Sequence, residues 1–247
     1  MNNELLLLSG EDILLDNIVI HQPTIKEIAF IGEESFFSGC ELLRFSKDNL
    51  EEKDKVRLTN YTNFEILMSM VREKNPVMQK NKIYILELLT LMFPKYQISL
   101  DKGYISLYNV EIDKEFKITK NNFEEFKNIM ELMFGLVKDD KDAPMYNPSG
   151  EMAKRIAEKL RKRHQKLTEK NIGKKVAILS RYISILAAAA QKDMTSFFDY
   201  TVFQLLDEFK RYQLKVQYDI YFQAKLAGAQ DLKEPEDWMN DIHPEIK

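Results

Sequence analysis

The residues whose types could support catalysis lie alone or far apart in this chain of 247 residues. The only cysteine, Cys40, could act as a nucleophile if a histidine and an orienting group met it in space. It lies four residues after Phe36 on the apolar face of a predicted helix, where a lone cysteine is typically a small core hydrophobe. The histidines His21, His164 and His243 have neither helical spacing nor a cysteine partner, so we predict no zinc site.

A magnesium-dependent nuclease is the enzymatic alternative. Such enzymes place an aspartate and a Glu-x-Lys triplet on adjacent strands, and Asp101 with Glu115 and Lys117 has this order in a hairpin-rich segment. A chain rich in Glu and Lys produces such triplets by chance, so we predict no catalytic residues and no enzyme. The same spacing recurs at Glu51/Lys53, Glu125/Lys127, Glu208/Lys210 and Glu245/Lys247.

A calcium loop is excluded by two positions. Asp140, Asp142 and Glu151 occupy the first, third and twelfth places of a possible EF-hand loop, but Pro144 and Met145 stand where the sharp turn requires other residues, glycine above all. The glycines are scattered singly, so no phosphate-binding or dinucleotide-binding loop is present. We therefore predict neither a metal nor a cofactor.

A basic run, Lys159–Lys166, invites a nucleic-acid hypothesis, because its cations could neutralise phosphates. Residues 151–175 hold ten Lys or Arg against three Glu, although the whole chain has a net charge of -3. No aromatic residue interleaves with the run to stack on bases. A solvated helix face, or one that pairs with an acidic partner, is favoured over nucleic acid.

The composition indicates an ordinary globular protein, with 45% hydrophobic and 30% charged residues. Eight Gly and seven Pro are few for this length, which favours helices over a turn-rich all-β fold. The longest apolar stretch, Val176–Ala190, contains Arg181 and is too short to span a membrane. The start of the chain lacks the basic region of a signal peptide, so we expect the protein in the cytoplasm.

The pattern of apolar residues predicts a predominantly α member of the α+β class, with a small N-terminal unit of strands and helices. Thr24 and Glu27 have the spacing of a capping box at the start of a helix that ends at Gly32. Residues 46–60 are charged and are predicted to form a loop. The predicted strands are 5–8, 13–15, 18–20, 97–100, 104–108 and 115–118, and the predicted helices are 24–31, 33–45, 62–72, 83–93 and one from 119 or 121 to 135.

A charged, proline-containing stretch at 138–148 is predicted to be a linker between an N-terminal unit, 1–137, and a C-terminal helical bundle, 149–247. Within the bundle, Val176–Ala190 is apolar on nearly every face and should lie at its centre. Thr201–Ala227 should form the last long helix, followed by a short helix around Trp238.

The last long helix carries more aromatic residues than one core stripe can bury. Its predicted stripe is Val202, Leu206, Phe209, Tyr212, Val216 and Ile220. Phe203, Tyr218, Tyr221 and Phe222 lie beyond it, so we predict that these four residues bind a protein partner or a second copy of the chain.

Several short phrases resemble a family from the structural gene clusters of tailed phages that infect Gram-positive bacteria. The first is His21-Gln22-Pro23-Thr24-Ile25-Lys26-Glu27-Ile28, followed by Ile31-Gly32-Glu33 and the pair Phe36-Phe37. The others are Asn60-Tyr61-Thr62-Asn63-Phe64-Glu65, Ala227-Gly228-Ala229 and Asp237-Trp238-Met239.

The resemblance implies a tail assembly chaperone or adaptor, which binds the tape measure protein and covers its apolar stripes until the tail tube forms. It implies no catalytic residues. Two alternatives remain: a structural virion protein at the neck or tail, and a nucleic-acid-binding or nuclease protein that acts in packaging.

Overall fold

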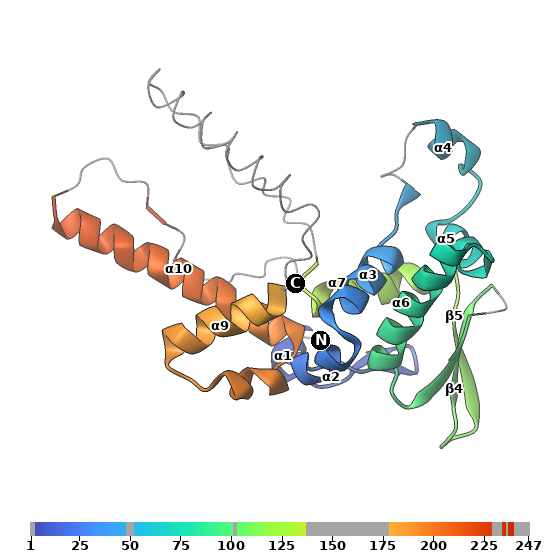
Figure 1. Cartoon of the computed structure of the whole chain (residues 1–247), viewed down its shortest axis with the longest axis horizontal. Coiled ribbons are helices and arrows are strands. Elements are labelled where there is room, and N and C mark those ends of the chain that lie inside the picture. The colour runs from blue at the N-terminus through green and yellow to red at the C-terminus, as the bar shows by residue number, and fades with distance from the viewer. Residues whose placement is uncertain are drawn as a thin grey trace. The chain divides into compact units, whose positions relative to one another are not determined.

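The computed structural model describes residues 3–47, 52–100, 103–136, 178–228, 234–235 and 237–239 (Figure 1). It has the predicted class, since helices predominate and the described strands form two small antiparallel sheets. The described residues up to 136 and those from 179 onward belong to one compact unit. The predicted linker, 138–148, lies outside the described residues, so the proposed domain boundaries stay a prediction.

The N-terminus corrects one expectation. Residues 5–8 were expected to be a strand, but they lie within helix α1, Asn3–Ser9. The other two strands predicted here form a hairpin, in which β1, Ile13–Leu15, pairs with β2, Ile18–Ile20. Its two-residue turn begins at Asp16, whose φ of 54° is one that Asp tolerates better than most residues. Four consecutive leucines show neither the period of a strand nor that of a helix, so their pattern does not distinguish the two. Tertiary packing therefore determined that this segment is helical.

The next two helices follow the predicted signals. Helix α2, Ile25–Ile31, begins with the capping box, in which Thr24 accepts from the Glu27 N–H and the Glu27 side chain accepts from the Thr24 N–H. Gly32 then takes a φ of 85° between α2 and α3, Glu33–Leu43. A side chain other than glycine rarely adopts this conformation, so Gly32 permits the immediate restart.

Three helices occupy residues 52–92. The predicted loop contains a helix, α4, Glu52–Arg57. Helix α5, Asn63–Arg72, begins with a second capping box, between Thr62 and Glu65. Helix α6, Pro76–Met92, begins seven residues before the predicted start, because proline fits the first turn of a helix, where its missing N–H has no partner to lose.

Helices α3 and α6 approach closely at Gly39. A Cβ atom there would lie 2.7 Å from the Tyr84 carbonyl oxygen and 2.9 Å from the Leu88 Cβ. Glycine therefore allows the two backbones to meet over the core. Phe36 of α3 and Phe134, which are fully or almost fully buried, meet edge to face with ring centres 4.8 Å apart.

The second sheet has the predicted hairpin and third strand, in the order β3–β4–β5. Its strands are Tyr96–Ser99, Ile105–Asn109 and Lys114–Ile118. Alternate residues of β4 are buried, as the period of a strand with one covered face requires. Helix α7, Phe123–Met133, follows and buries Phe123, Phe126, Met130 and Met133.

The C-terminal helices complete the same core. Helix α9, Ile178–Ala190, η2, Met194–Asp199, and α10, Val202–Leu226, contribute buried residues to one cluster with the N-terminal elements. A third capping box, Thr201 with Gln204, begins α10. Thr201 also forms an antiparallel bridge with Thr24, and the Ile25 N–H donates to the Tyr200 carbonyl over 2.8 Å. The first turns of α2 and α10 are thus joined directly.

Two expectations about these helices were wrong. Helix α9 is not enclosed on every side, because it buries only Leu179, Ile183, Leu186 and Ala187, while Ser184 and Ala188 are exposed. Small residues such as alanine raise apolarity without needing burial. The described residues around Trp238 form a turn instead of the expected helix. Among the described helices, none has both the length and the apolarity to cross a membrane.

Candidate partner-binding site

Cys40 is a core residue of α3. Its side chain is buried, and burial raises the pKa of its thiol far above the ordinary value. The reactive form of cysteine is the thiolate, so this thiol is held in its unreactive form. The structure therefore supports the interpretation of Cys40 as a small hydrophobe.

The residues of the nuclease hypothesis form a surface ion pair. Glu115 Oε2 and Lys117 Nζ on β5 lie 3.1 Å apart, and the Ser106 hydroxyl donates to Glu115 Oε1 over 2.6 Å. The hydrogen bond with Glu115 raises the pKa of Lys117, whose ammonium also lies 4.6 Å from the centre of the Tyr104 ring. These groups are engaged with one another on the sheet. Asp101 lies outside the described residues.

Within the ranges that the structure describes, no group of three or more His, Cys, Asp or Glu side chains is arranged to hold a metal ion. The calcium near-miss at Asp140, Asp142 and Glu151 lies outside these ranges, as do the basic run, His164 and His243. The absence of enzymatic activity stays a prediction.

His21 has two carboxylate partners that the sequence analysis missed. Its Nδ1 lies 3.0 Å from Asp12 Oδ1, and its Nε2 lies 3.2 Å from both oxygens of Glu27. Burial alone would raise the pKa of Glu27, but hydrogen bonds from the Thr24 backbone and hydroxyl and from His21 lower it below the ordinary value. The histidine thus ties the segment before β1 to the capping box of α2. Only the fold brings these groups together, because neither spacing is a motif.

The C-terminal half of α10, residues 215–226, is the strongest candidate for binding a partner. Tyr218, Phe222 and Leu226 follow a spacing of i, i+4, i+8, which places them in one stripe on the helix. Phe222 is 43% exposed and Leu226 is 87% exposed. We call this set the distal stripe. No residue of this half is buried, so its apolar side chains have little cover from the described parts of the chain.

The aromatic rings of the distal half support one another. The Tyr218 and Phe222 ring centres lie 4.7 Å apart, and the Tyr221 ring meets Phe222 edge to face at 5.8 Å. Lys225 Nζ donates to the Tyr221 hydroxyl over 3.4 Å. Three of the four predicted partner-binding residues therefore lie together.

The fourth residue, Phe203, lies elsewhere. Only 2% of its surface is exposed, and it belongs to the core cluster at the start of α10. A partner could contact it only after displacing its neighbours. The predicted core stripe was also incomplete, since Phe203, Leu205 and Leu214 are buried while Ile220 is 60% exposed.

The middle of α10 contacts Trp238, one of the described C-terminal residues. Asp207 is buried and pairs with Arg211 over 3.2 Å, and Arg211 Nη1 donates to the Trp238 carbonyl over 3.2 Å. Trp238 itself is half-buried. This contact lies before the distal half begins.

A family model described as the YomV second domain matches residues 169–243, a phage-associated family. The match covers α9, η2 and α10, and therefore the distal stripe. No curated protein and no solved structure matches the chain. The C-terminal part is thus similar to a phage-associated family, in agreement with the phage resemblance of the short phrases. The matched helices do not form a core of their own, because they bury residues together with the N-terminal elements.

Proposed function

We propose that this protein is a phage tail assembly chaperone or adaptor, which binds the tape measure protein through the distal stripe of α10. The observation that carries the proposal is the apolar face of half-buried Tyr218 and exposed Phe222 and Leu226, within the segment that is similar to a phage-associated family.

The chemistry of this face suits the partner. A tape measure protein has long amphipathic helices, whose apolar stripes need cover before the tail tube forms. An exposed helix face with aromatic side chains can pack against such a stripe at i, i+3 and i+4 positions. Aromatic residues supply large contact areas at low cost in conformational entropy, which favours them as anchors of an interface.

The test uses the full chain co-expressed with the tape measure protein of the same phage. The variant Tyr218→Ser/Phe222→Ser removes two rings of the stripe, and the matched control Gln213→Ser/Gln217→Ser changes two exposed polar residues of the same helix. Size-exclusion chromatography should show that the first variant loses the complex and that the control keeps it. Circular dichroism should show the same helical content in both isolated chains.

Two results would contradict the proposal. Loss of helical signal in the isolated aromatic variant would make the rings part of the fold, and retention of the complex would place the interface elsewhere. Mass spectrometry of purified particles separates the main alternative, because a chaperone is absent from virions and a structural protein is present at fixed stoichiometry. Size-exclusion chromatography of the chain alone determines whether it forms a homo-oligomer.

A further inference from the structure

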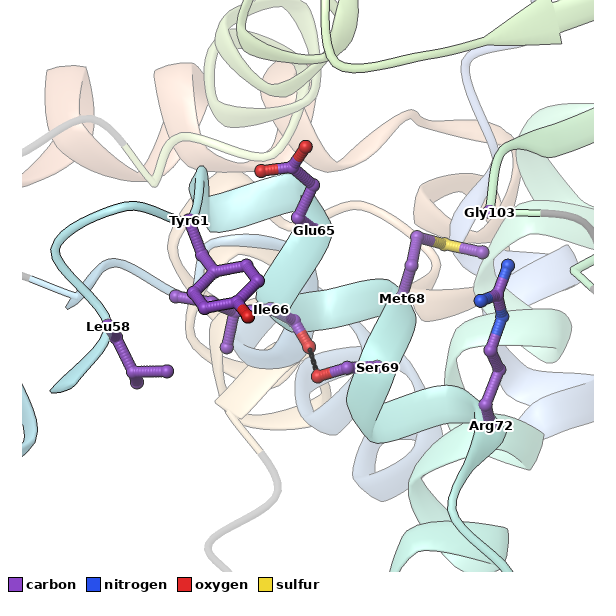
Figure 2. A pocket seen from close by; sticks show the side chains of 8 residues that line it. All are labelled: Leu58, Tyr61, Glu65, Ile66, Met68, Ser69, Arg72 and Gly103. Atoms are coloured by element: carbon purple, nitrogen blue, oxygen red, sulfur yellow. Dashed lines mark hydrogen bonds between the residues drawn. The ribbon is translucent and has the colours of Figure 1, made fainter.

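A cavity of about 500 Å³ lies along α5, far from the distal stripe in the sequence (Figure 2). One side is formed by the turn after α4, with Leu58 and Tyr61, and the other by Gly103 in the turn between β3 and β4. Its volume lies within the range of small-molecule sites, about 300–1,000 Å³.

The wall of the cavity along α5 is mainly apolar. Ile66 and Met68 lie between Tyr61 at one end and Arg72 at the other, as Figure 2 shows. The Ser69 hydroxyl also reaches this wall, but it donates to the Ile66 carbonyl of its own helix over 2.7 Å. Lys47 Nζ donates to the Tyr61 carbonyl over 3.2 Å and so steadies the turn that closes this end.

Glu65 and Arg72, the two charged side chains of the cavity, differ in whether described residues compensate their charge. The Glu65 carboxylate accepts from the Thr62 N–H over 2.9 Å and from its hydroxyl over 3.0 Å, and Lys120 Nζ lies 3.7 Å away. Its charge is therefore already compensated. Among the described residues, no carboxylate forms an ion pair with Arg72, so none of them compensates the positive charge at the far end of the cavity.

The Arg72 guanidinium packs against Gly103, where a larger residue would leave no room for it. A Cβ atom at Gly103 would lie 2.8 Å from Arg72 Nη2, and Gly103 has a φ of +78° that other residues rarely adopt. The guanidinium thus lies over a glycine in a tight turn. A planar guanidinium offers paired N–H donors that match the two oxygens of a carboxylate.

We propose that this cavity binds a small amphipathic carboxylate, with its apolar body along Tyr61, Ile66 and Met68 and its carboxylate on Arg72. Arg72 lies seven residues after Glu65, which corresponds to about 10 Å along the helix, since each residue rises about 1.5 Å. This length suits a medium-chain carboxylate. The proposal concerns other elements than the partner-binding proposal, so either can fail alone.

The experiment measures binding to the full chain by ligand-observed nuclear magnetic resonance titration. Octanoate is the charged probe, and octanamide is a neutral probe of nearly the same shape. Octanoate should bind more tightly than octanamide by up to about fivefold, because a partly exposed ion pair contributes at most about that factor. This comparison requires no substitution.

Substitutions then locate the site. Arg72→Gln should reduce octanoate affinity by up to about fivefold and leave octanamide affinity unchanged, because only the charged interaction is lost. Tyr61→Ala should weaken both probes. The control Arg181→Gln changes an exposed arginine on α9, outside the cavity, and should alter neither affinity.

Three results would overturn the proposal. The first is an absence of saturable octanoate binding, and the second is an octanoate affinity that Arg72→Gln does not change. The third concerns a peptide as the occupant: if acetyl-Leu-Leu-Glu-amide binds at the cavity and octanoate does not displace it, the site takes a protein segment instead of a small carboxylate.

Discussion

Helix α10 has a proximal half, Val202–Leu214, and a distal half, residues 215–226. The two halves have similar apolar content, but they differ in how much of their surface other elements bury. The proximal half buries Val202, Phe203, Leu205 and Leu214, and the ring of its Phe209 stacks on Tyr182 of α9 at 4.0 Å. The distal half exposes Phe222 and Leu226. An apolar residue in a helix therefore belongs to the core or to the surface according to which elements pack against it. The distal half is less covered than the proximal half, so it is the half that a partner can contact.

The largest expected effect tests this contrast with one substitution made in each half. Phe203→Ala should lower the free energy of unfolding by about 3–5 kcal/mol, because it leaves a cavity in the core. Phe222→Ala should lower it by less than about 0.5 kcal/mol, the value of a surface contact with Tyr218. Urea unfolding followed by circular dichroism measures both. Similar losses in the two variants would mean that the halves are equally covered.

A smaller effect on stability is expected at Thr201, the N-cap residue of α10. Thr201→Ala removes the hydroxyl that accepts from the Gln204 N–H at the start of α10, which should cost about 1 kcal/mol. The control Thr195→Ala alters an exposed threonine of η2 and should change the free energy of unfolding little. If the Thr201 variant is as stable as the parent chain, the cap does not anchor the helix.

The smallest expected effect concerns pH. Thr201 is bridged to Thr24, whose capping box contains a titratable Glu27, whereas the box of α10 has the neutral Gln204. Hydrogen bonds lower the pKa of Glu27 in the folded chain below its ordinary 4.5. The charged form therefore contributes stability that is fully present above the unfolded pKa and is lost as pH falls through the folded pKa.

Glu27→Gln should consequently show a smaller drop in Tm than the parent chain when the pH falls from about 5 to about 3. Glu111→Gln, which removes an exposed carboxylate from the turn after β4, serves as the control. An identical drop in the parent chain and the Glu27 variant would show that this capping box does not contribute to acid sensitivity.

Much of the fold could be predicted where local chemistry is sufficient. The capping box at Thr24 and the hairpin around Gly103 formed as expected, because both depend on hydrogen bonds and φ values within a few residues. The helix at residues 5–8 and the early start of α6 at Pro76 were missed. A short leucine run has no distinctive period, and a proline can either end a helix or begin one.

For the candidate site, the sequence determined that α10 carries more aromatic residues than one stripe can bury. It did not determine which of them the fold would cover. Phe203 and Phe222 have the same side chain in the same helix, and only the packing of neighbouring elements distinguishes them. The carboxylates around His21 and the placement of Arg72 beside Gly103 likewise depend on segments brought together by tertiary structure. Local signals act over a few residues, whereas burial and charge compensation depend on groups distant in the chain.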